Sequence, residues 1–334
     1  MAENEAVIFE GEKKVNLGTQ PFPEVAANEV LIETKRSLIS IGTELTQLSG
    51  EFPEGSDWDN NVNYPFTPGY CNIGQVISVG DNVEEDWVGE RVATHNPHAR
   101  FVTETAKNII SVPDEVSDGE AALFALAAIA ANGVRRGRVT FGESIAVFGC
   151  GVIGQLTARW CRIAGAETII GVNRTNTRLS YLPNEPGVEG VTSMRSDPDR
   201  RLKAETDGQL ADVVFEVTGN PDAIVEEVDI LREQGRLVIL SSPSGETTLD
   251  FHDHCNHPSY EIIGAHTSSH PTNRNLSRSW TRNRHAELFL RLVADGRLSV
   301  KKMVSHVESY ENSSEIYASL LKDRTEAMAV EFKW

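Results

Sequence analysis

The pattern of apolar and polar residues changes near residue 120. Before that point, runs of β-branched residues separated by Gly, Pro and Asn predict short strands at 29–40, 74–80 and 89–95. No strong helical period occurs in the first 115 residues, so this part is expected to be an all-β unit. After that point the stretch EAALFALAAIAANGVRRG, which begins at Glu120, is helical by composition.

Strands and helices then alternate. The apolar run SIAVFG at 144–149 predicts a strand of a parallel sheet that is covered on both faces. The segment VIGQLTARWCRIAGA has one apolar stripe and predicts a helix that ends at Gly165, and TIIGVN at 168–173 predicts the next strand. ADVVFEVTG and GRLVILSSPSG repeat the strand pattern, with the predicted helix PDAIVEEVDILREQG between them. This alternation predicts an α/β fold with a doubly wound parallel sheet, the Rossmann type.

The pattern breaks after His266. The segment TSSHPTNRNLSRSWTRNRH is polar and predicts a loop, and AELFLRLVADGRLSV predicts one amphipathic helix. Residues 266–284 have two open interpretations, because they can either wall a cleft or cover the edge of a dimer.

Composition narrows the class of protein. The chain has 334 residues, of which 40% are hydrophobic and 24% charged, which leaves room for two ordinary domains. A net charge of −18 argues against a nucleic-acid partner, because phosphates require a basic face. The start of the chain shows no signal-peptide pattern, and the longest apolar run, at 121–131, is too short to span a membrane. We therefore expect a cytoplasmic protein with a small-molecule substrate.

A glycine-rich turn follows the first strand of the alternating region. GCGVIG fits G-x-G-x-x-G with its glycines at Gly149, Gly151 and Gly154, and Val152 and Ile153 open the next helix. Such a turn brings backbone N–H groups and the positive end of a helix dipole to a pyrophosphate. The strand, turn and helix occur in the required order, so we predict that this turn binds a dinucleotide.

The end of the second strand distinguishes between the two nicotinamide dinucleotides. An NAD site usually has an acidic residue there to accept hydrogen bonds from the ribose 2′-OH, whereas this chain has Asn173 and Arg174. An arginine can bind a 2′-phosphate and stack on adenine, and Arg178 lies one helical turn further on. These residues favour NADP(H). The alternative is that both arginines are solvated surface residues.

Three passages resemble the medium-chain dehydrogenase/reductase superfamily over almost the whole chain. They are GTEL at 42–45, PGYCNIGQVISVG at 68–80 and AVFGCGVIGQLTARWCRIAGA. SLISIGTEL with PGYCNIG is most similar to the branch of bacteriochlorophyllide-type alcohol dehydrogenases. The resemblance implies a GroES-like catalytic domain (1–118, completed by 266–334), a Rossmann domain (119–265), and a homodimer or homotetramer.

The residues that bind zinc in this family are missing. Ile41, Tyr70 and Cys71 stand where zinc-dependent members carry Cys, His and Glu, and residues 91–101 lack the cysteines of the family's structural zinc lobe. A catalytic zinc needs three protein ligands, so we predict no metal site. Cys71 is then expected to be a small buried side chain, with a redox role or another metal as alternatives. The four histidine and cysteine residues of FHDHCNHPSY are not expected to bind metal either, because alternating side chains point apart.

Without zinc, hydrogen-bond donors must stabilise charge on the reacting oxygen. The resemblance assigns Thr43 to a proton relay and places Tyr70 in the same cavity, and His98 titrates in a useful range. Each has a simpler explanation: a turn cap, a packed tyrosine and a loop histidine. Glu44 is expected to be structural. The predicted function is a zinc-independent, NADP(H)-dependent oxidoreductase that interconverts an alcohol and a carbonyl, with a polyol or sugar-like substrate as one option. Reduction of an activated C=C bond or a quinone, and an NADPH-binding sensor without chemistry, remain alternatives.

Overall fold

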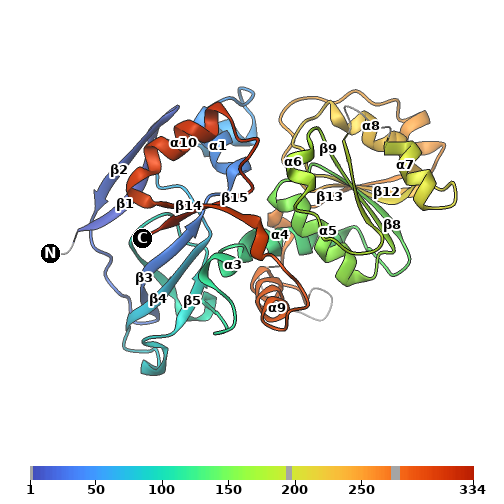
Figure 1. The fold of residues 1–334 in the computed structure, drawn as a ribbon. Coiled ribbons are helices and arrows are strands. Elements are labelled where there is room, and N and C mark those ends of the chain that lie inside the picture. The colour runs from blue at the N-terminus through green and yellow to red at the C-terminus, as the bar shows by residue number, and fades with distance from the viewer. Residues whose placement is uncertain (1–2, 193–197, 272–278) are drawn as a thin grey trace. The chain divides into compact units, whose positions relative to one another are not determined.

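The computed structural model describes residues 3–192, 198–271 and 279–334 (Figure 1). The chain divides into two compact units. The first comprises Met1–Leu126 with Ala286–Trp334, and the second comprises Ala127–His285. The sequence analysis placed these boundaries at 118/119 and 265/266.

The first unit is built on strands that pair antiparallel, except for β14, which runs parallel to β15. A seven-stranded sheet has the order β14-β15-β3-β4-β5-β7, β6 also pairs with β3, and β1 and β2 form a separate hairpin. The predicted strands at 29–40, 74–80 and 89–95 are confirmed as β3, β4 and β5. The strands are β1 (Asn4–Gly11), β2 (Lys14–Gln20), β3 (Glu29–Leu38), β4 (Asn72–Val79), β5 (Arg91–Thr94), β6 (Phe101–Thr105), β7 (Ile110–Ser111), β14 (Val304–Ser309) and β15 (Ala329–Lys333).

The expectation that the first 115 residues contain no helix is wrong. Helix α1 (Ile41–Ser49) follows β3 directly, and α2 (Asp57–Asn61) comes next. Helix α1 buries Leu45 and Leu48 and stops at Gly50, which has a left-handed φ of 67°. Leu45 and Leu48 are separated by a single helical spacing, and two apolar positions are too few to show a helical period in the sequence. Outside these residues, α3 (Asp118–Ala122) and α10 (Ser313–Lys322) also belong to the first unit, whereas α4 (Phe124–Arg136) and α9 (Arg282–Ala294) each span a boundary between the two units.

The second unit confirms the predicted α/β fold class. Its six parallel strands have the order β10-β9-β8-β11-β12-β13, with α5 and α6 on one side of the sheet and α7 and α8 on the other (Figure 1). Gly165 ends α5 with φ 98°, as predicted. The elements are β8 (Ser144–Phe148), α5 (Val152–Ala164), β9 (Thr168–Asn173), α6 (Asn176–Leu179), β10 (Val188–Thr192), α7 (Pro198–Glu205), β11 (Ala211–Glu216), α8 (Ala223–Asp229), β12 (Leu231–Ile239) and β13 (Glu261–Gly264).

The helix predicted for PDAIVEEVDILREQG is only half right. Helix α8 ends at Asp229, and the remaining residues begin β12, which pairs with β11. The pairing is interrupted by a bulge in which Gln234 has a positive φ of 62°. Burial of Leu231 between strands outweighs the helical propensity of the segment. In the polar segment after His266, residues 272–278 lie outside the described residues, and α9 begins at Arg282.

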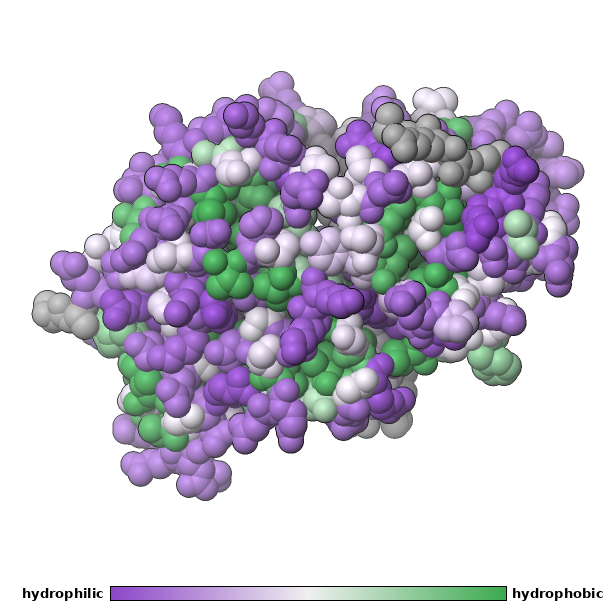
Figure 2. All heavy atoms as spheres, viewed as in Figure 1, coloured by the Kyte–Doolittle hydropathy of each residue, from purple (hydrophilic) through white to green (hydrophobic). Residues whose placement is uncertain are grey.

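The face of the molecule in Figure 2 is mostly hydrophilic, and its apolar residues are scattered. This agrees with the acidic composition. Within the described residues, no helix is both long enough and apolar enough to cross a membrane.

Candidate active site

A cluster of three hydroxyl groups lies in the first unit. Its side chains come from the segment around GTEL at 42–45 and from the start of PGYCNIGQVISVG at 68–80. The hydroxyl oxygen of Tyr70 is 2.5 Å from Oγ of Ser40, and the Thr43 side chain also hydrogen bonds to Tyr70. Ser40 precedes α1, and Thr43 lies in its first turn. Thr43 and Tyr70, which the resemblance places in one cavity, therefore lie next to each other. Ser40 was missed, although it lies within the quoted stretch SLISIGTEL.

The phenol of Tyr70 is held in its neutral form. Burial raises its pKa above the usual value of 10.0, the neighbouring Cys71 adds to the rise, and hydrogen bonds from Ser40 and Thr43 oppose it. A neutral phenol remains a hydrogen-bond donor across the whole physiological pH range. Tyr70 is thus suited to donate to an oxygen atom rather than to act as a phenolate base.

His98 takes a different place from the one expected for a residue that meets the substrate. Its side chain is fully buried behind the loop of Tyr70, where a Cβ on Gly69 would lie 2.7 Å from the imidazole. Nδ1 is 2.8 Å from Oγ of Ser37, and Nε2 is 3.1 Å from Oε2 of Glu44. Glu44 is also fully buried, and its Oε1 accepts a hydrogen bond of 2.7 Å from the backbone N–H of Ser40.

Two residues from the far end of the chain complete this network and fix its hydrogen-bond directions. The indole of Trp334 donates to Oγ of Ser37 at 2.8 Å, and the hydroxyl of Tyr317 donates to Oε2 of Glu44. Because an indole only donates, the Ser37 hydroxyl is free to donate to Nδ1 of His98. Nε2–H of His98 then donates to Glu44. The Glu44 carboxylate thus accepts three hydrogen bonds, from Ser40, His98 and Tyr317.

The residues in this region do not fit a zinc ion. Ile41 packs against an apolar cluster of the first unit, Tyr70 is bonded to Ser40, and Cys71 is fully buried, which confirms the prediction for its burial. Among the residues that the structure describes, no group of three or more His, Cys, Asp or Glu side chains is placed to hold a metal ion. Zinc requires three or four such ligands.

The histidine-rich segment FHDHCNHPSY forms a π-helical turn at His252–Asn256. The His252 imidazole is 2.7 Å from the carboxylate of its neighbour Asp253, and Nδ1 of His254 accepts from the backbone of Asp250. These local contacts occupy the side chains with their own turn. In the first unit, the imidazole of His95 packs against an aromatic ring: its ring centre lies 4.9 Å from that of Phe124.

The glycine-rich turn in the second unit has the geometry that a pyrophosphate needs. Gly149 has φ 93°, and a Cβ there would lie 2.7 Å from the carbonyl oxygen of Val217. A Cβ on Gly154 would lie 1.9 Å from the Gly149 oxygen, so both positions accept only glycine. Gly151 precedes α5 and provides no side-chain cap, so no N-cap side chain occupies the first N–H groups of the helix, which include those of Val152 and Ile153. The turn therefore fits a dinucleotide.

Asn173, Arg174 and Arg178 lie beside this turn. Oδ1 of Asn173 accepts a hydrogen bond of 3.3 Å from the backbone N–H of Cys150, which ties the end of β9 to the turn. Arg174 follows and is exposed. Nη1 of Arg178 lies 3.4 Å from the point where a Cβ of Gly151 would be. One cationic side chain, Arg178, therefore lies next to the glycine-rich turn, Arg174 follows β9 at the surface, and no carboxylate ends β9.

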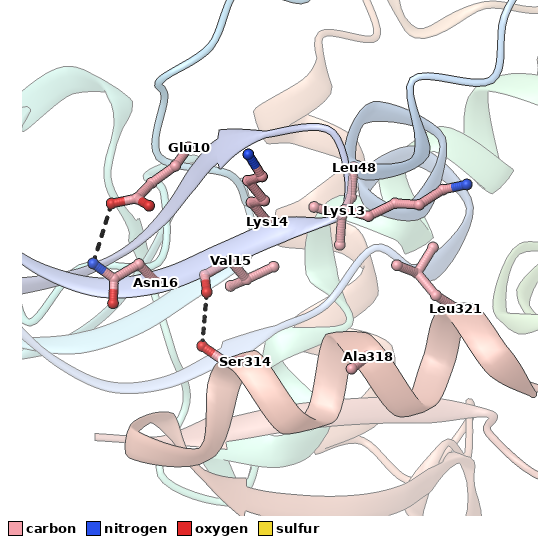
Figure 3. A pocket seen from close by; sticks show the side chains of 9 residues that line it. All are labelled: Glu10, Lys13, Lys14, Val15, Asn16, Leu48, Ser314, Ala318 and Leu321. Carbon is pink, nitrogen blue, oxygen red and sulfur yellow. Dashed lines mark hydrogen bonds between the residues drawn. The ribbon is translucent and has the colours of Figure 1, made fainter.

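Figure 3 shows a groove of about 730 Å³ that is lined by the β1–β2 hairpin, α1 and α10 of the first unit. Lys13 at its rim pairs with Glu51 at 2.6 Å, and Ser314 donates to the backbone oxygen of Val15. The groove contains none of the hydroxyl groups around Tyr70. It has no arrangement of acid and base for a reaction, so we place the chemistry at the hydroxyl cluster.

Two protein-family models match this chain, one mostly in the first unit and one in the second. The alcohol dehydrogenase GroES-like domain family matches residues 26–133, and the zinc-binding dehydrogenase family matches residues 152–281. D-guloside 3-dehydrogenase of Escherichia coli K12 is 26% identical over 324 residues, which cover 90% of this chain and 91% of that protein.

Two solved structures are similar over the full length of both chains. One, from Sinorhizobium meliloti 1021, is assigned as a zinc-binding dehydrogenase and bound to NADP (TM-score 0.81, 20% identity, 100% of each chain). The other is an alcohol dehydrogenase from Escherichia coli CFT073 complexed with NADH (TM-score 0.81, 17% identity, 100% of each chain). Since both of its domains are matched, the chain belongs to the medium-chain alcohol dehydrogenase superfamily.

Proposed function

We propose that this protein is an NADP(H)-dependent oxidoreductase that interconverts an alcohol and a carbonyl without a catalytic zinc. The observation that carries the proposal is the hydroxyl cluster of Ser40, Thr43 and Tyr70 at the place where the family binds its metal. The D-guloside 3-dehydrogenase relative supports a polyol or sugar-like substrate. The narrower likeness to bacteriochlorophyllide-type dehydrogenases stays a prediction from the quoted motifs.

The side chains of the cluster can do the work that a Lewis acid does elsewhere. The bound dinucleotide supplies or accepts the hydride, so the protein has to orient the substrate and manage one proton. Tyr70 donates a hydrogen bond to the substrate oxygen, where negative charge develops. Ser40 and Thr43 hold the phenol in position, and Thr43 offers a route for the proton. His98 acts as a positioning residue, because the buried network fixes Glu44 and through it the backbone of Ser40.

The choice of NADP(H) over NAD(H) rests on the residues of this chain. Of the two similar structures, one holds NADP and the other NADH, so the fold permits both. Arg174 is exposed at the end of β9 and Arg178 is close to Gly151, which suits a phosphate on the adenosine ribose. Asn173 carries no negative charge that would repel this phosphate.

Metal analysis tests the zinc-independent part. Purified protein is expected to contain less than stoichiometric zinc and to keep its NADPH-dependent turnover after treatment with a chelator. The donor set around Tyr70 gives the reason, because it provides no three ligands. A stoichiometric zinc ion whose removal abolishes turnover would overturn the proposal.

Product analysis tests the reaction class. With 4-deuterated NADPH and a panel of carbonyl compounds, we expect the deuterium at the carbinol carbon of an alcohol. Deuterium on a saturated C–C bond would instead assign the protein to the enoyl or quinone reductases. Tight NADPH binding, without oxidation of NADPH by any carbonyl compound, enone or quinone, would favour a sensor.

We also propose that the chain forms a homodimer or homotetramer. Strand β13 pairs only with β12 within the described sheet, and its Ile262 is 41% exposed. An open edge with an apolar residue suits pairing with a second copy. Light scattering on the purified protein measures the state directly, and a monomer at micromolar concentration would contradict this proposal.

A further inference from the structure

Two arginines enclose a tryptophan in the second unit. The guanidinium carbon of Arg135, on α4, lies 3.4 Å from the ring centre of Trp280, and that of Arg284, in the first turn of α9, lies 3.9 Å from it. Two guanidinium groups at these distances would overlap if they shared one face of the ring. They therefore lie on opposite faces of the indole, in cation–π contact with it.

The positive charge of this stack is not neutralised within the described residues. Arg135 donates through Nε to His285, and Arg284 donates through Nη1 to the backbone oxygen of Ser279. Neither guanidinium has a carboxylate within ion-pair distance among the residues that the structure describes. The remaining guanidinium N–H groups and the indole N–H of Trp280 donate to no protein acceptor among these described residues either. Burial, followed by the positive charge of Arg284, lowers the pKa of Arg135 to about 10.

A relay of neutral imidazoles fixes Arg135. Its Nε is 2.9 Å from Nε2 of His285, Nδ1 of His285 is 3.1 Å from Nε2 of His270, and Nδ1 of His270 is 2.9 Å from the backbone oxygen of Thr267. Arginine can only donate, so each imidazole accepts on one side and donates on the other. Burial lowers the pKa of both histidines, that of His285 to about 3. The relay therefore orients the arginine and adds no charge.

The relay ends at the carboxyl edge of the parallel sheet. Thr267 begins the turn Thr267–Ser269, which closely follows β13, and Asn132 of α4 holds that turn by donating to Ser269 at 2.8 Å. In open α/β sheets, ligands bind beyond the carboxyl ends of the strands. The same edge contains the glycine-rich turn after β8.

We propose that Arg135, Trp280 and Arg284 form a binding site for an oxyanion, the carboxylate or phosphate group at the acidic end of the substrate. Two guanidinium groups held apart by a rigid ring offer fork-shaped donors from two sides, which is the arrangement that planar or tetrahedral oxyanions require. A chain with a net charge of −18 has many carboxylates, yet none of those described neutralises this pair. The assignment to a substrate rests on the proposed function, whereas binding of the anion does not.

Anion binding is tested first, with inorganic phosphate as the probe. The indole N–H signals of the five tryptophans are followed by NMR, and Trp280→Phe identifies the signal of Trp280. We expect that signal to shift and saturate with phosphate. Arg135→Met and Arg284→Met should each weaken binding about tenfold, and added salt should weaken it further. Arg291→Met removes the same charge from an exposed position on α9 and serves as the matched control.

A stack that only joins α4 to α9 predicts another result. In that case phosphate leaves the Trp280 signal unmoved, or Arg291→Met weakens binding as much as Arg284→Met does. Either outcome overturns the site. The dispersion of the other four indole signals reports whether each variant is folded, and Arg284→Lys, which keeps the charge and loses the fork, should bind with an intermediate affinity.

Kinetics then distinguish a substrate from a free ion. An alcohol with a carboxylate or phosphate group is compared with a neutral alcohol of the same length. Arg284→Met is expected to raise the KM of the charged alcohol, relative to that of the neutral one, about tenfold. An unchanged ratio together with saturable phosphate binding supports the anion site and assigns it to a free ion. If no alcohol is oxidised at all, the proposed function fails, while the phosphate titration still decides the site.

Discussion

Nε2 of His98 lies 3.1 Å from Oε2 of Glu44, and both side chains are completely buried. A buried charged group is stable only when its hydrogen-bonding capacity is used, and here the carboxylate accepts from Ser40, His98 and Tyr317. Glu44 belongs to the first turn of α1, which also carries Thr43. The value of the pair to the protein is that it holds the start of this helix against the loop of Tyr70.

Glu44→Gln is therefore expected to destabilise the protein by about 3 kcal/mol, because the amide presents a donor to groups that also donate. Urea unfolding at pH 7 measures the free energy of unfolding. Glu51→Gln, at an exposed glutamate that pairs with Lys13, is the control and should change it by less than about 1 kcal/mol. Equal effects of the two substitutions would show that the network holds little energy.

Tyr70→Phe removes the donor that we assign to the substrate oxygen. We expect kcat for carbonyl reduction to fall about 100-fold while the KM for NADPH stays the same, because the phenol does not bind the cofactor. Since burial raises the pKa of Tyr70, the hydroxyl stays protonated up to pH 10, and the parent protein should show no loss of reduction from this group below that pH. Steady-state kinetics between pH 6 and pH 10 measure both.

Tyr64→Phe is the matched control, since Tyr64 donates its hydroxyl to the backbone of Gln47 in the same unit. It should leave kcat within about twofold. Loss of NADPH affinity in Tyr70→Phe, with kcat unchanged, would contradict the assigned role.

The glycine-rich turn was predictable because its signal is local. Strand, turn and helix follow one another without interruption, so the sequence itself displays the geometry around Gly149 and Gly154. Thr43 and Tyr70 were predictable only through the motifs of the resembled family. The network beneath them was not, because Tyr317 and Glu44 are 273 residues apart and Trp334 and Ser37 are 297 apart. The antiparallel pairing of β15 with β3 brings Trp334 to Ser37, and the packing of α10 against α1 brings Tyr317 to Glu44.

The stack around Trp280 illustrates the same limit. Its arginines come from segments that are polar and loop-like or lie at the end of a helix, and such residues read as solvated surface. Whether Arg135 and Arg284 meet depends on how α4 packs against the start of α9, which no local pattern contains. The prediction that His98 takes part in catalysis has the opposite weakness. A titratable side chain near a motif suggests chemistry, but the sequence does not show whether that side chain is buried or exposed.

Arg174→Met should lower the preference for NADPH. We expect kcat/KM for NADPH to fall between about tenfold and 100-fold, with that for NADH nearly unchanged, because in the proposed binding mode the guanidinium contacts only the additional phosphate. Initial rates with each cofactor measure the ratio. Arg200→Met, at an exposed position on α7, removes the same charge and should leave the ratio unchanged. Equal losses for both cofactors would mean that Arg174 does not read the 2′-phosphate.

Glu227 gives a test of stability against pH. Its side chain is fully buried on α8 without a hydrogen-bond partner among the described residues, and burial, followed by the charge of Glu216, raises its pKa from 4.5 to about 9. The folded protein therefore keeps a proton that the unfolded chain releases between these values. The resulting stabilisation is complete below pH 4.5 and is lost as the pH rises to about 9.

Glu227→Gln mimics the protonated side chain and should remove this part of the pH dependence. The difference between the urea midpoints at pH 5 and pH 9 is expected to shrink, mainly because the variant is more stable than the parent at pH 9. Glu226→Gln removes the neighbouring exposed carboxylate and should preserve the parent's difference, apart from a small change in net charge. If both variants respond alike, net charge rather than the buried proton controls the alkaline loss of stability.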